Sequence, residues 1–318
     1  LVGLVGSEMC IRDRSNIALN IEGLSKTYPG QIEALKNISL KVESGDFYAL
    51  LGPNGAGKST AIGIISSLVT KTSGLVEILG IDIDENHSLA KKKLGVVGQE
   101  VNFNQFETVY QVLSHQAGYY GLSSKEVTEN THYYLKALGL WDKRNDQGRN
   151  LSGGMKRRLM VAKALVNNPD LLILDEPSAG VDIELRRSLW DFLKEINGKG
   201  TTIILTTHYL EEAEKLCKNI SIIDEGSIIK TSSMTSLLNE LETQNYLFEL
   251  KHPIPSNLDY SNFNLNFIGE NQFSVNVNGD NTLNQIIKFL SENNIEVVNM
   301  TNETNRLEEL FLKLTNKK

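Results

Sequence analysis

Apolar and polar residues alternate over the first part of the chain with the period of two that half-buried strands show. The alternation runs through residues 16–50. A short apolar strand is expected at Phe47–Leu51, and it leads into a glycine-rich stretch. Lys58–Val69 then has the spacing of a helix, and Leu75–Leu79 is expected to form another short strand. The pattern therefore predicts strands packed with a helix.

The spacing becomes helical over residues 106–146, where aromatic residues are also frequent. From Leu171 onward, strands and helices alternate again. The expected strands are Leu171–Leu174, Thr202–Thr206 and Ile220–Ile223, and the expected helices are Glu184–Ile196 and Leu210–Leu216. Such alternation is typical of a largely parallel sheet covered by helices, so residues 106–146 are predicted to be a helical insert between two halves of an α/β domain.

The composition shifts after about Met234, where asparagine becomes dense. We interpret residues 235–318 as a small α+β domain without a catalytic constellation. Its expected strands are Tyr246–Leu250, Gln272–Val277 and Ile295–Met300, and its expected helices are Thr282–Glu292 and Asn305–Leu314.

The first residues do not fit this picture. Leu4–Asp13 reads LVGSEMCIRD, which resembles one reading frame of a sequencing adaptor. Residues 1–14 are expected to be a sequencing-adaptor artefact, with a disordered tail as the alternative. The predicted organisation then places a main domain at residues 15–234, with its helical subdomain at about 100–165, and a small domain at residues 235–318.

The bulk properties limit the function classes. The chain has 318 residues, of which 40% are hydrophobic and 22% charged, and its net charge is −7. An acidic surface does not attract nucleic acid as a whole. The two cysteines, Cys10 and Cys217, make no disulfide framework, so a cytoplasmic location is expected. No stretch reaches the roughly 18–20 apolar residues that span a bilayer, so membrane spans would have to come from another polypeptide.

One segment fits the phosphate-loop pattern G-x-x-x-x-G-K-[ST]. Glycines let backbone N–H groups approach phosphate oxygens, and the following helix points its positive end at the same anion. Lys58 is expected to reach the β- and γ-phosphates, and Ser59 to ligate Mg²⁺. A plain glycine-rich turn is the alternative, which the strand before and the helix after disfavour. The segment is Gly52-Pro53-Asn54-Gly55-Ala56-Gly57-Lys58-Ser59-Thr60.

The apolar strand from Leu171 ends in two carboxylates, Asp175 and Glu176. A strand end beside a phosphate loop is where a Mg²⁺-positioning Asp belongs, so Asp175 is assigned that role. Glu176 is then placed to orient and deprotonate an attacking water. Acids at a strand end also cap helices in many proteins, but the phosphate loop favours the catalytic interpretation.

A third motif, LSGG, lies at residues 151–154, before an expected helix at Met155–Val166. Ser152 is expected to cap that helix, with Gly153 and Gly154 behind it. LSGG between a phosphate loop and an LLILDEP strand resembles the ABC ATPase family. The resemblance implies a cassette with a RecA-like P-loop core, an antiparallel β subdomain and a helical subdomain. It also implies a homodimer that sandwiches two ATP molecules, with Ser152, Gly153 and Gly154 covering the γ-phosphate held by the other chain.

The resemblance assigns four further residues. Tyr28 would stack on adenine, although an ordinary strand-end tyrosine is the alternative. Gln99 would contact Mg²⁺ or the attacking water, although Gly98 stands where the family usually has proline. Asp182 is the landmark of a loop at Ser178–Asp182, and His208 would contact the γ-phosphate. The other histidines are expected to be structural.

Within the family, residues 179–214 and the ending NRLEELF resemble the YadG type, an ABC type-2 exporter ATPase subunit. This implies a Mg-dependent ATPase on the inner face of the membrane, bound to a separate permease and not to nucleic acid. One alternative is an ABC machine acting on ribosomes or nucleic acid, but such chains usually carry two cassettes, long coiled-coil inserts or zinc-type cysteines. The other alternative is a regulatory cassette that binds ATP without hydrolysing it. The intact Lys58, Asp175, Glu176 and His208 argue against that alternative.

Overall fold

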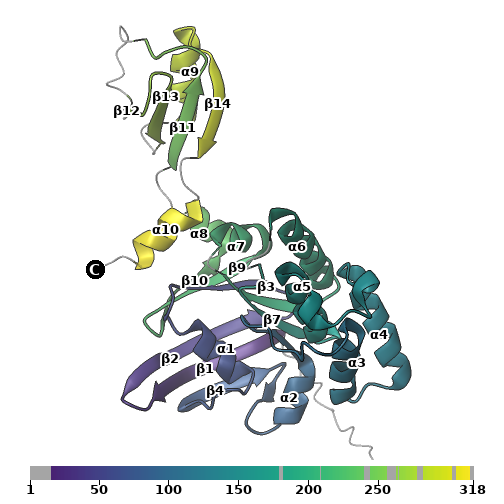
Figure 1. Ribbon diagram of the computed structural model, residues 1–318. Coiled ribbons are helices and arrows are strands. Elements are labelled where there is room, and N and C mark those ends of the chain that lie inside the picture. Colours follow the sequence, from purple (N-terminus) through teal and green to yellow (C-terminus); the bar gives the residue numbers. More distant parts are fainter. Residues whose placement is uncertain are drawn as a thin grey trace, which may run out of the picture. The chain divides into compact units, whose positions relative to one another are not determined.

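The computed structural model begins with a four-stranded antiparallel sheet (Figure 1). Strand β1 lies between β2 and β4, and its alternate residues, such as Leu19 and Ile21, are buried on one face. The four strands are, in the order β2-β1-β4-β5 in which they pair, Ile32–Glu43, Ile17–Tyr28, Ser73–Ile78 and Ile81–Asp82. The period-two pattern therefore corresponds to a sheet with one face in the core.

The structure describes residues 16–178, 182–207, 209–239, 244–255, 263, 265–277, 282–302 and 306–315. The predicted adaptor segment, residues 1–14, lies outside them. Two compact units divide the chain between Thr231 and Ser232. Among the described residues, no helix combines the length and the apolar character that a membrane span requires.

A six-stranded sheet forms the centre of the first unit. Every residue of β3, β7 and β8 is buried, as expected for parallel strands covered on both faces. Strand β3 pairs in parallel with β8 and β9, and β7 pairs in parallel with β6 and β8. The strands, in the order β10-β9-β3-β8-β7-β6, are Ser227–Ser233, Asn219–Asp224, Phe47–Leu51, Thr202–Thr206, Leu171–Asp175 and Leu94–Val97.

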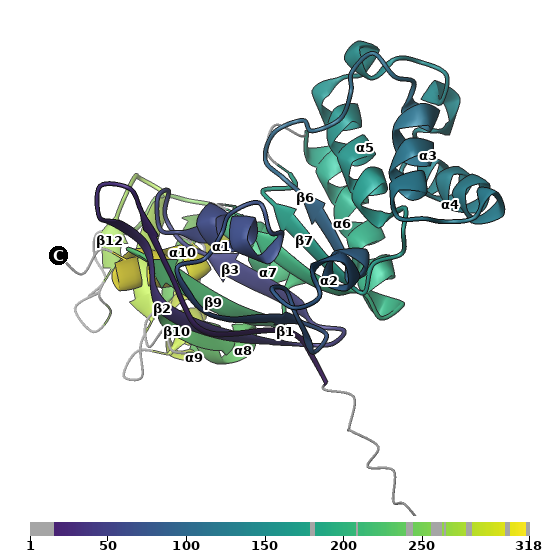
Figure 2. The ribbon, with the colours of Figure 1, turned by 90° about the horizontal axis from the view of Figure 1, so that it is seen from below.

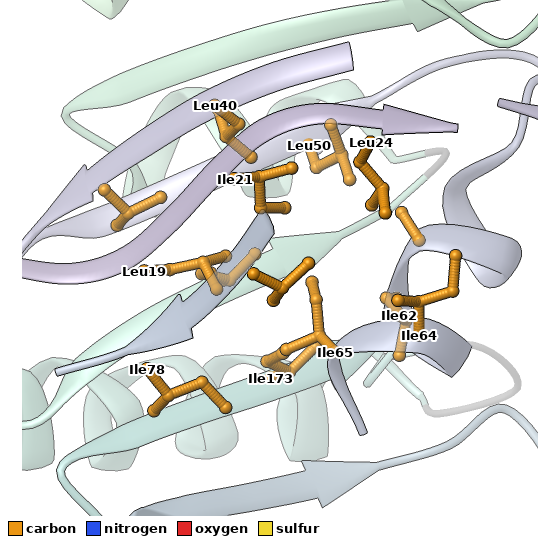
Figure 3. Close-up of a cluster of buried hydrophobic side chains, with 14 of the residues drawn as sticks. Leu19, Ile21, Leu24, Leu40, Leu50, Ile62, Ile64, Ile65, Ile78 and Ile173 are labelled. Carbon is orange, nitrogen blue, oxygen red and sulfur yellow. The ribbon is translucent and has the colours of Figure 1, made fainter. Parts of the chain in front are cut away.

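One apolar core lies between this sheet and the antiparallel sheet (Figure 3). Helix α1, Lys58–Ile65, contributes Ile64 and Ile65, which are less than 4% exposed. Leu19 and Ile21 reach the core from β1, and Ile173 reaches it from β7. The helix that follows the glycine-rich loop is therefore held from both sides.

Helix α1 is shorter than its hydrophobic spacing predicts. Ser67 has φ 58°, in the left-handed region. The Ser67 N–H donates to the carbonyl of Ile64, and the Leu68 N–H donates to the carbonyl of Gly63. This is a Schellman C-terminus, which closes the helix at Ile65. Leu68 and Val69, expected within the helix, lie beyond its end.

A helical layer follows in the middle of the chain, where α3, α4 and α5 gather beside α6 (Figure 2). Thr108 and Ser123 start α3 and α4 with capping boxes to Gln111 and Glu126. The helices of this unit, besides α1, are α2 His87–Lys93, α3 Val109–Tyr119, α4 Ser124–Ala137, α5 Gly153–Leu165, α6 Ile183–Gly198 and α7 Leu210–Leu216, with short 3-10 segments at Trp141–Lys143 and Gly148–Asn150.

The described residues of the second unit form a four-stranded antiparallel sheet in the order β12-β13-β11-β14, together with three helices. Phe248 and Phe273 stack at 5.1 Å between ring centroids, and Ile286 and Leu290 of α9 pack into the same core. Helix α8 packs against α10. The elements are α8 Met234–Asn239, β11 Gln244–Leu250, β12 Leu265–Phe267, β13 Gln272–Val277, α9 Leu283–Glu292, β14 Val297–Asn302 and α10 Arg306–Thr315.

Candidate functional site

The loop between β3 and α1 forms the floor of the candidate site. Gly57, immediately before α1, has φ 109°, which L side chains rarely adopt. A Cβ atom there would lie 2.7 Å from the carbonyl oxygen of Ala34, so only glycine fits. No side chain caps the N-terminus of α1. Its first backbone N–H groups and the positive end of its dipole are thus available to an anion.

A cavity of about 170 Å³ opens above this loop. It brings together segments that are far apart in the sequence. Its lining residues are Ala34, Asn54, Gly55, Ala56, Gly57, Lys58, Ser59, Thr60, Gln99, Asp175 and Glu176. The predicted phosphate loop, the two strand-end carboxylates and the predicted glutamine therefore face the same space, as their proposed roles require.

Lys58 is only 8% exposed, and its side chain folds back over the loop. The Nζ atom donates to the carbonyl oxygens of Gly52 at 2.6 Å and Pro53 at 3.0 Å. Burial lowers the pKa of the Lys58 ammonium, and the carboxylates of Glu176 and Asp175 oppose that shift. The loop thus places a partly desolvated amine in the cavity, where its attraction to phosphate is less screened by water.

Asp175 stands at the carboxyl end of β7, opposite Thr206 of β8. The Thr206 hydroxyl donates to Oδ1 of Asp175, and both side chains are buried. This hydrogen bond fixes the orientation of the carboxylate. Ligands of open α/β sheets bind at the carboxyl ends of the strands, which is where Asp175 lies.

Glu176 has φ 51°, a left-handed backbone conformation that costs on the order of 1–3 kcal/mol for a residue with a side chain. Its N–H donates to the carbonyl of Thr206 at 2.9 Å. Gln99 Nε2 donates to Glu176 Oε2 at 3.3 Å. The strained turn directs the Glu176 carboxylate into the cavity beside Gln99.

The residues in the cavity fit a magnesium ion. Mg²⁺ prefers hard oxygen ligands and is usually held by one or two carboxylates together with substrate phosphates. Ser59, Gln99 and Asp175 offer a hydroxyl, an amide and a carboxylate to one space. Among the described residues, no group of three His, Cys, Asp or Glu side chains could hold a metal by itself. The donor set therefore suits an ion that arrives with a nucleotide.

Arg157, in α5, is a residue that the sequence analysis did not identify. It is 6% exposed, and its guanidinium donates to five backbone carbonyls. The acceptors are Gly98 at 2.7 Å, Gln99 at 3.1 Å, Asp175, Glu176 and Pro177 at 2.9 Å. One guanidinium thereby joins the segment that carries Gln99 to the segment that carries both carboxylates. A charged residue on the buried face of a predicted helix is the signal that could have revealed it.

The predicted γ-phosphate cover lies outside the cavity lining. Ser152 and Gly153 are exposed at the start of α5. The Ser152 hydroxyl accepts from the Met155 N–H at 3.3 Å, which confirms the predicted cap. Asp182 is likewise exposed, and it caps α6 by accepting from the Leu185 N–H at 2.9 Å.

Two predicted site residues stand apart from this geometry. Tyr28 lies at the end of β1, paired with Ile32, and Lys26 Nζ lies 4.8 Å from the centre of its ring. It is not among the residues that line the cavity. His208, predicted to contact the γ-phosphate, lies outside the described residues. Its assignment stays a prediction.

Comparisons with known proteins agree with this geometry. The family described as ABC transporter matches residues 35–179. The linearmycin resistance ATP-binding protein LnrL of Bacillus subtilis is 39% identical over 223 residues, which cover 70% of this chain and 71% of that protein. Nod factor export ATP-binding protein I of Cupriavidus metallidurans is 39% identical over 221 residues, which cover 70% of this chain and 73% of that protein.

Solved structures show the same fold. A dimeric post-hydrolysis state of an ATP-binding cassette bound to ADP and Pi superposes with a TM-score of 0.63 and 28% identity, over 68% of this chain and 98% of that one. A subunit from Clostridium perfringens, described as part of an ABC transporter complex, gives a TM-score of 0.65 and 29% identity, over 71% of this chain and 92% of that one. The α/β fold predicted from the sequence is confirmed.

Proposed function

We propose that this chain, which belongs to the ABC transporter family of ATP-binding proteins, drives export through a separate membrane permease as an ATP-sandwiched dimer. The chain is the ATP-binding subunit of an ABC transporter and an ATPase of the ABC type. The export direction, the permease and the dimer are the parts proposed here.

The observation that carries the proposal is the convergence of Lys58, Ser59, Gln99, Asp175 and Glu176 on one cavity above an uncapped helix N-terminus. Phosphoryl transfer needs positioning and charge stabilisation more than covalent chemistry. The loop amides and the Lys58 ammonium would neutralise the phosphates. Glu176 would orient the attacking water and accept its proton, while Gln99 holds the Glu176 carboxylate in place.

Magnesium is the second cofactor that we propose. When bound, it would neutralise charge on the β- and γ-phosphate oxygens. Ser59, Asp175 and Gln99 would hold it. The Thr206 hydroxyl would fix the Asp175 carboxylate for that purpose.

The dimer is supported by the separation between the cavity and the LSGG segment. The exposed Ser152 and Gly153 would contact the γ-phosphate in the cavity of the partner subunit, and Gly154 would lie behind them. His208 and Asp182 would complete the closed site. Nucleotide would then favour a closed dimer and hydrolysis an open one, which is a two-state device suited to driving an attached permease.

The exporter role is supported by the relatives, one named for Nod factor export and another for linearmycin resistance. The chain would act on the cytoplasmic face of the membrane, as its membership of the ABC transporter family implies. Its permease would be a type-2 transmembrane subunit on another polypeptide.

Purification of the full chain from detergent-solubilised membranes tests this proposal. A polypeptide with several membrane spans should co-purify. The ATPase rate of this chain should change when the complex is reconstituted in vesicles. The Glu176→Gln variant, which should stay bound to Mg-ATP, is the matched control. It shows whether retention of the membrane polypeptide depends on bound nucleotide. Recovery of ribosomes or DNA in place of a membrane polypeptide would overturn the transporter assignment in favour of a machine acting on nucleic acid.

A further inference from the structure

A buried carboxyl group on α7 makes contacts that the proposed ATPase mechanism does not use. Glu212 is fully buried, with 0% exposure. Its Oε1 atom accepts from Trp190 Nε1 at 2.8 Å, and its Oε2 atom accepts from the Ser178 hydroxyl at 3.0 Å. Burial raises the pKa of the Glu212 carboxyl group, and hydrogen bonding from Thr207, Trp190 and Ser178 opposes that shift. Burying a carboxyl group is costly unless it is hydrogen-bonded, and these three donors offset that cost.

The three partners come from separate elements beside the site. Ser178 follows the strand end that carries Asp175 and Glu176, and it is 0% exposed. Thr207 follows β8, directly after the Thr206 that holds Asp175. Two of the carboxyl group's bonds therefore reach segments that continue directly from the catalytic strands.

The bond to Thr207 also fixes the residues around position 208. Thr207 Oγ1 accepts from the Tyr209 N–H at 2.9 Å. The Glu212 N–H donates to the carbonyl of Tyr209 at 2.9 Å. The residues on both sides of the proposed γ-phosphate contact are thus tied to one glutamate, through its side chain and through its backbone.

Trp190 provides a contrast within the same group. Its indole lies on α6, and its bond to Oε1 reaches no residue of the cavity. One oxygen of the Glu212 carboxyl group therefore bonds to the indole on α6, and the other bonds to the Ser178 hydroxyl. This division makes the packing role and the positioning role separable by mutation.

We propose that Glu212 is a positioning residue for ATP hydrolysis, joining the segment after Glu176 to the segment before residue 208 so that both move as one unit. The inference rests on the proposed ATPase site. Ser178 and Thr207 would then respond together to the γ-phosphate. Misplacement of a group by about 1 Å can cost on the order of 100-fold in rate.

Steady-state ATPase kinetics of the full-length Glu212→Ala variant test the proposal. We expect kcat to fall by about 10- to 100-fold while the KM for ATP changes less than about threefold, because the variant misplaces groups at the γ-phosphate and leaves the phosphate loop intact. Glu212→Gln should retain most of the rate, since its amide keeps the size of the side chain and the hydroxyls of Ser178 and Thr207 can either donate or accept.

Single-contact variants separate positioning from packing. Ser178→Ala and Thr207→Val should lower kcat, Thr207→Ser should restore it, and Trp190→Phe should leave it near the wild-type value. These variants keep Glu212 in place, so they test its positioning role even if Glu212→Ala fails to fold. Equal losses in Trp190→Phe and Ser178→Ala, or an unchanged kcat in Ser178→Ala and Thr207→Val, would overturn the proposal. An inactive wild-type chain would instead overturn the proposed function.

Discussion

The phosphate-loop cavity and the LSGG segment differ in how their backbone polar groups are satisfied. At the cavity, no side chain caps α1, and Lys58 is held by the carbonyls of its own loop. At the LSGG segment, Ser152 caps α5, and Ser152 and Gly153 are exposed to solvent. The cavity is thus a concave anion site, whereas the LSGG segment is a capped helix end on the surface.

From this difference we expect that neither region suffices alone. The cavity supplies the positive loop and the carboxylates, and no residue of the LSGG segment is among its lining residues. A capped, exposed helix start suits contact with another chain, because little has to rearrange when a ligand approaches it. The two regions are connected within one chain by Arg157, which starts from α5 and holds the backbone of Gln99 and Glu176.

The largest effect should come from the carboxylate of Glu176. Glu176→Gln should lower kcat by about 10²–10⁴-fold, because it removes the proposed general base without changing size. Nucleotide binding should persist, so the variant should form a stable dimer with Mg-ATP. Size-exclusion chromatography with light scattering, with and without ATP, measures this. A variant that stays monomeric at saturating Mg-ATP would break the comparison between cavity and LSGG segment.

Mixing two inactive chains tests directly whether the two regions act across chains. Lys58→Ala damages the cavity, and Ser152→Asp keeps a good helix cap while it places a carboxylate against the γ-phosphate. Each variant alone should be nearly inactive. An equal mixture should recover about one quarter of the wild-type rate, because half of the random dimers are mixed and each of these holds one intact site.

The control for that mixture uses the double variant, with both changes in one chain, mixed with wild type. Its mixed dimers hold one site damaged in the cavity and one damaged at the LSGG segment, so no mixed dimer has an intact site. If circular dichroism shows that both variants are folded and the first mixture still recovers no ATPase activity, the shared site is contradicted.

Arg157 should give a smaller effect that reveals the connection between the regions. Arg157→Met removes the donors to five backbone carbonyls and should destabilise the fold by about 2–4 kcal/mol. Because those carbonyls belong to the segments of Gln99 and Glu176, we also expect kcat to fall by roughly tenfold. Urea denaturation and ATPase assays of the same preparation measure both. A loss of stability with an unchanged kcat would show that Arg157 serves only packing.

Tyr28 should give the smallest effect. If it stacks on adenine, Tyr28→Ala should raise the KM for ATP by about tenfold and leave kcat unchanged, since stacking on an aromatic ring contributes about 1–3 kcal/mol. Tyr28→Phe keeps the ring and should match the wild type. An unchanged KM in Tyr28→Ala would place the adenine elsewhere and limit the nucleotide site to the cavity.

The sequence predicts most of this fold because its strong elements have strong patterns. Phe47–Leu51, Thr202–Thr206 and Gln272–Val277 have the same bounds in the sequence prediction and in the structure. Strand β6 was missed because it is short and contains Gly95, where a Cβ atom would lie 2.4 Å from the carbonyl of Ala164. Helix α2 was missed because only Ala90 of its residues is buried.

The contacts around the candidate site were less predictable than its motifs. The phosphate loop and the acidic strand end have local patterns, whereas Arg157 and Glu212 act through partners distant in sequence. Helical spacing can place a charged residue on the buried face of its helix, but it does not show which groups the residue contacts, because those partners are fixed by tertiary packing. The Asp182 cap of α6 is local by contrast, because its donor, the Leu185 N–H, lies three residues along the chain.

The order of strands in the central sheet also governs when the site can form during synthesis. Strand β3, which leads into the phosphate loop, has β8 and β9 as its only sheet neighbours among the described strands, with Phe47 beside Ile203. A nascent chain that ends before β8 would present β3, which leads into the loop, without a paired strand on either side. Long-range pairing of this kind is slow to form. The nucleotide site therefore becomes available only late in translation, and ATP would selectively stabilise chains that have already completed their sheet.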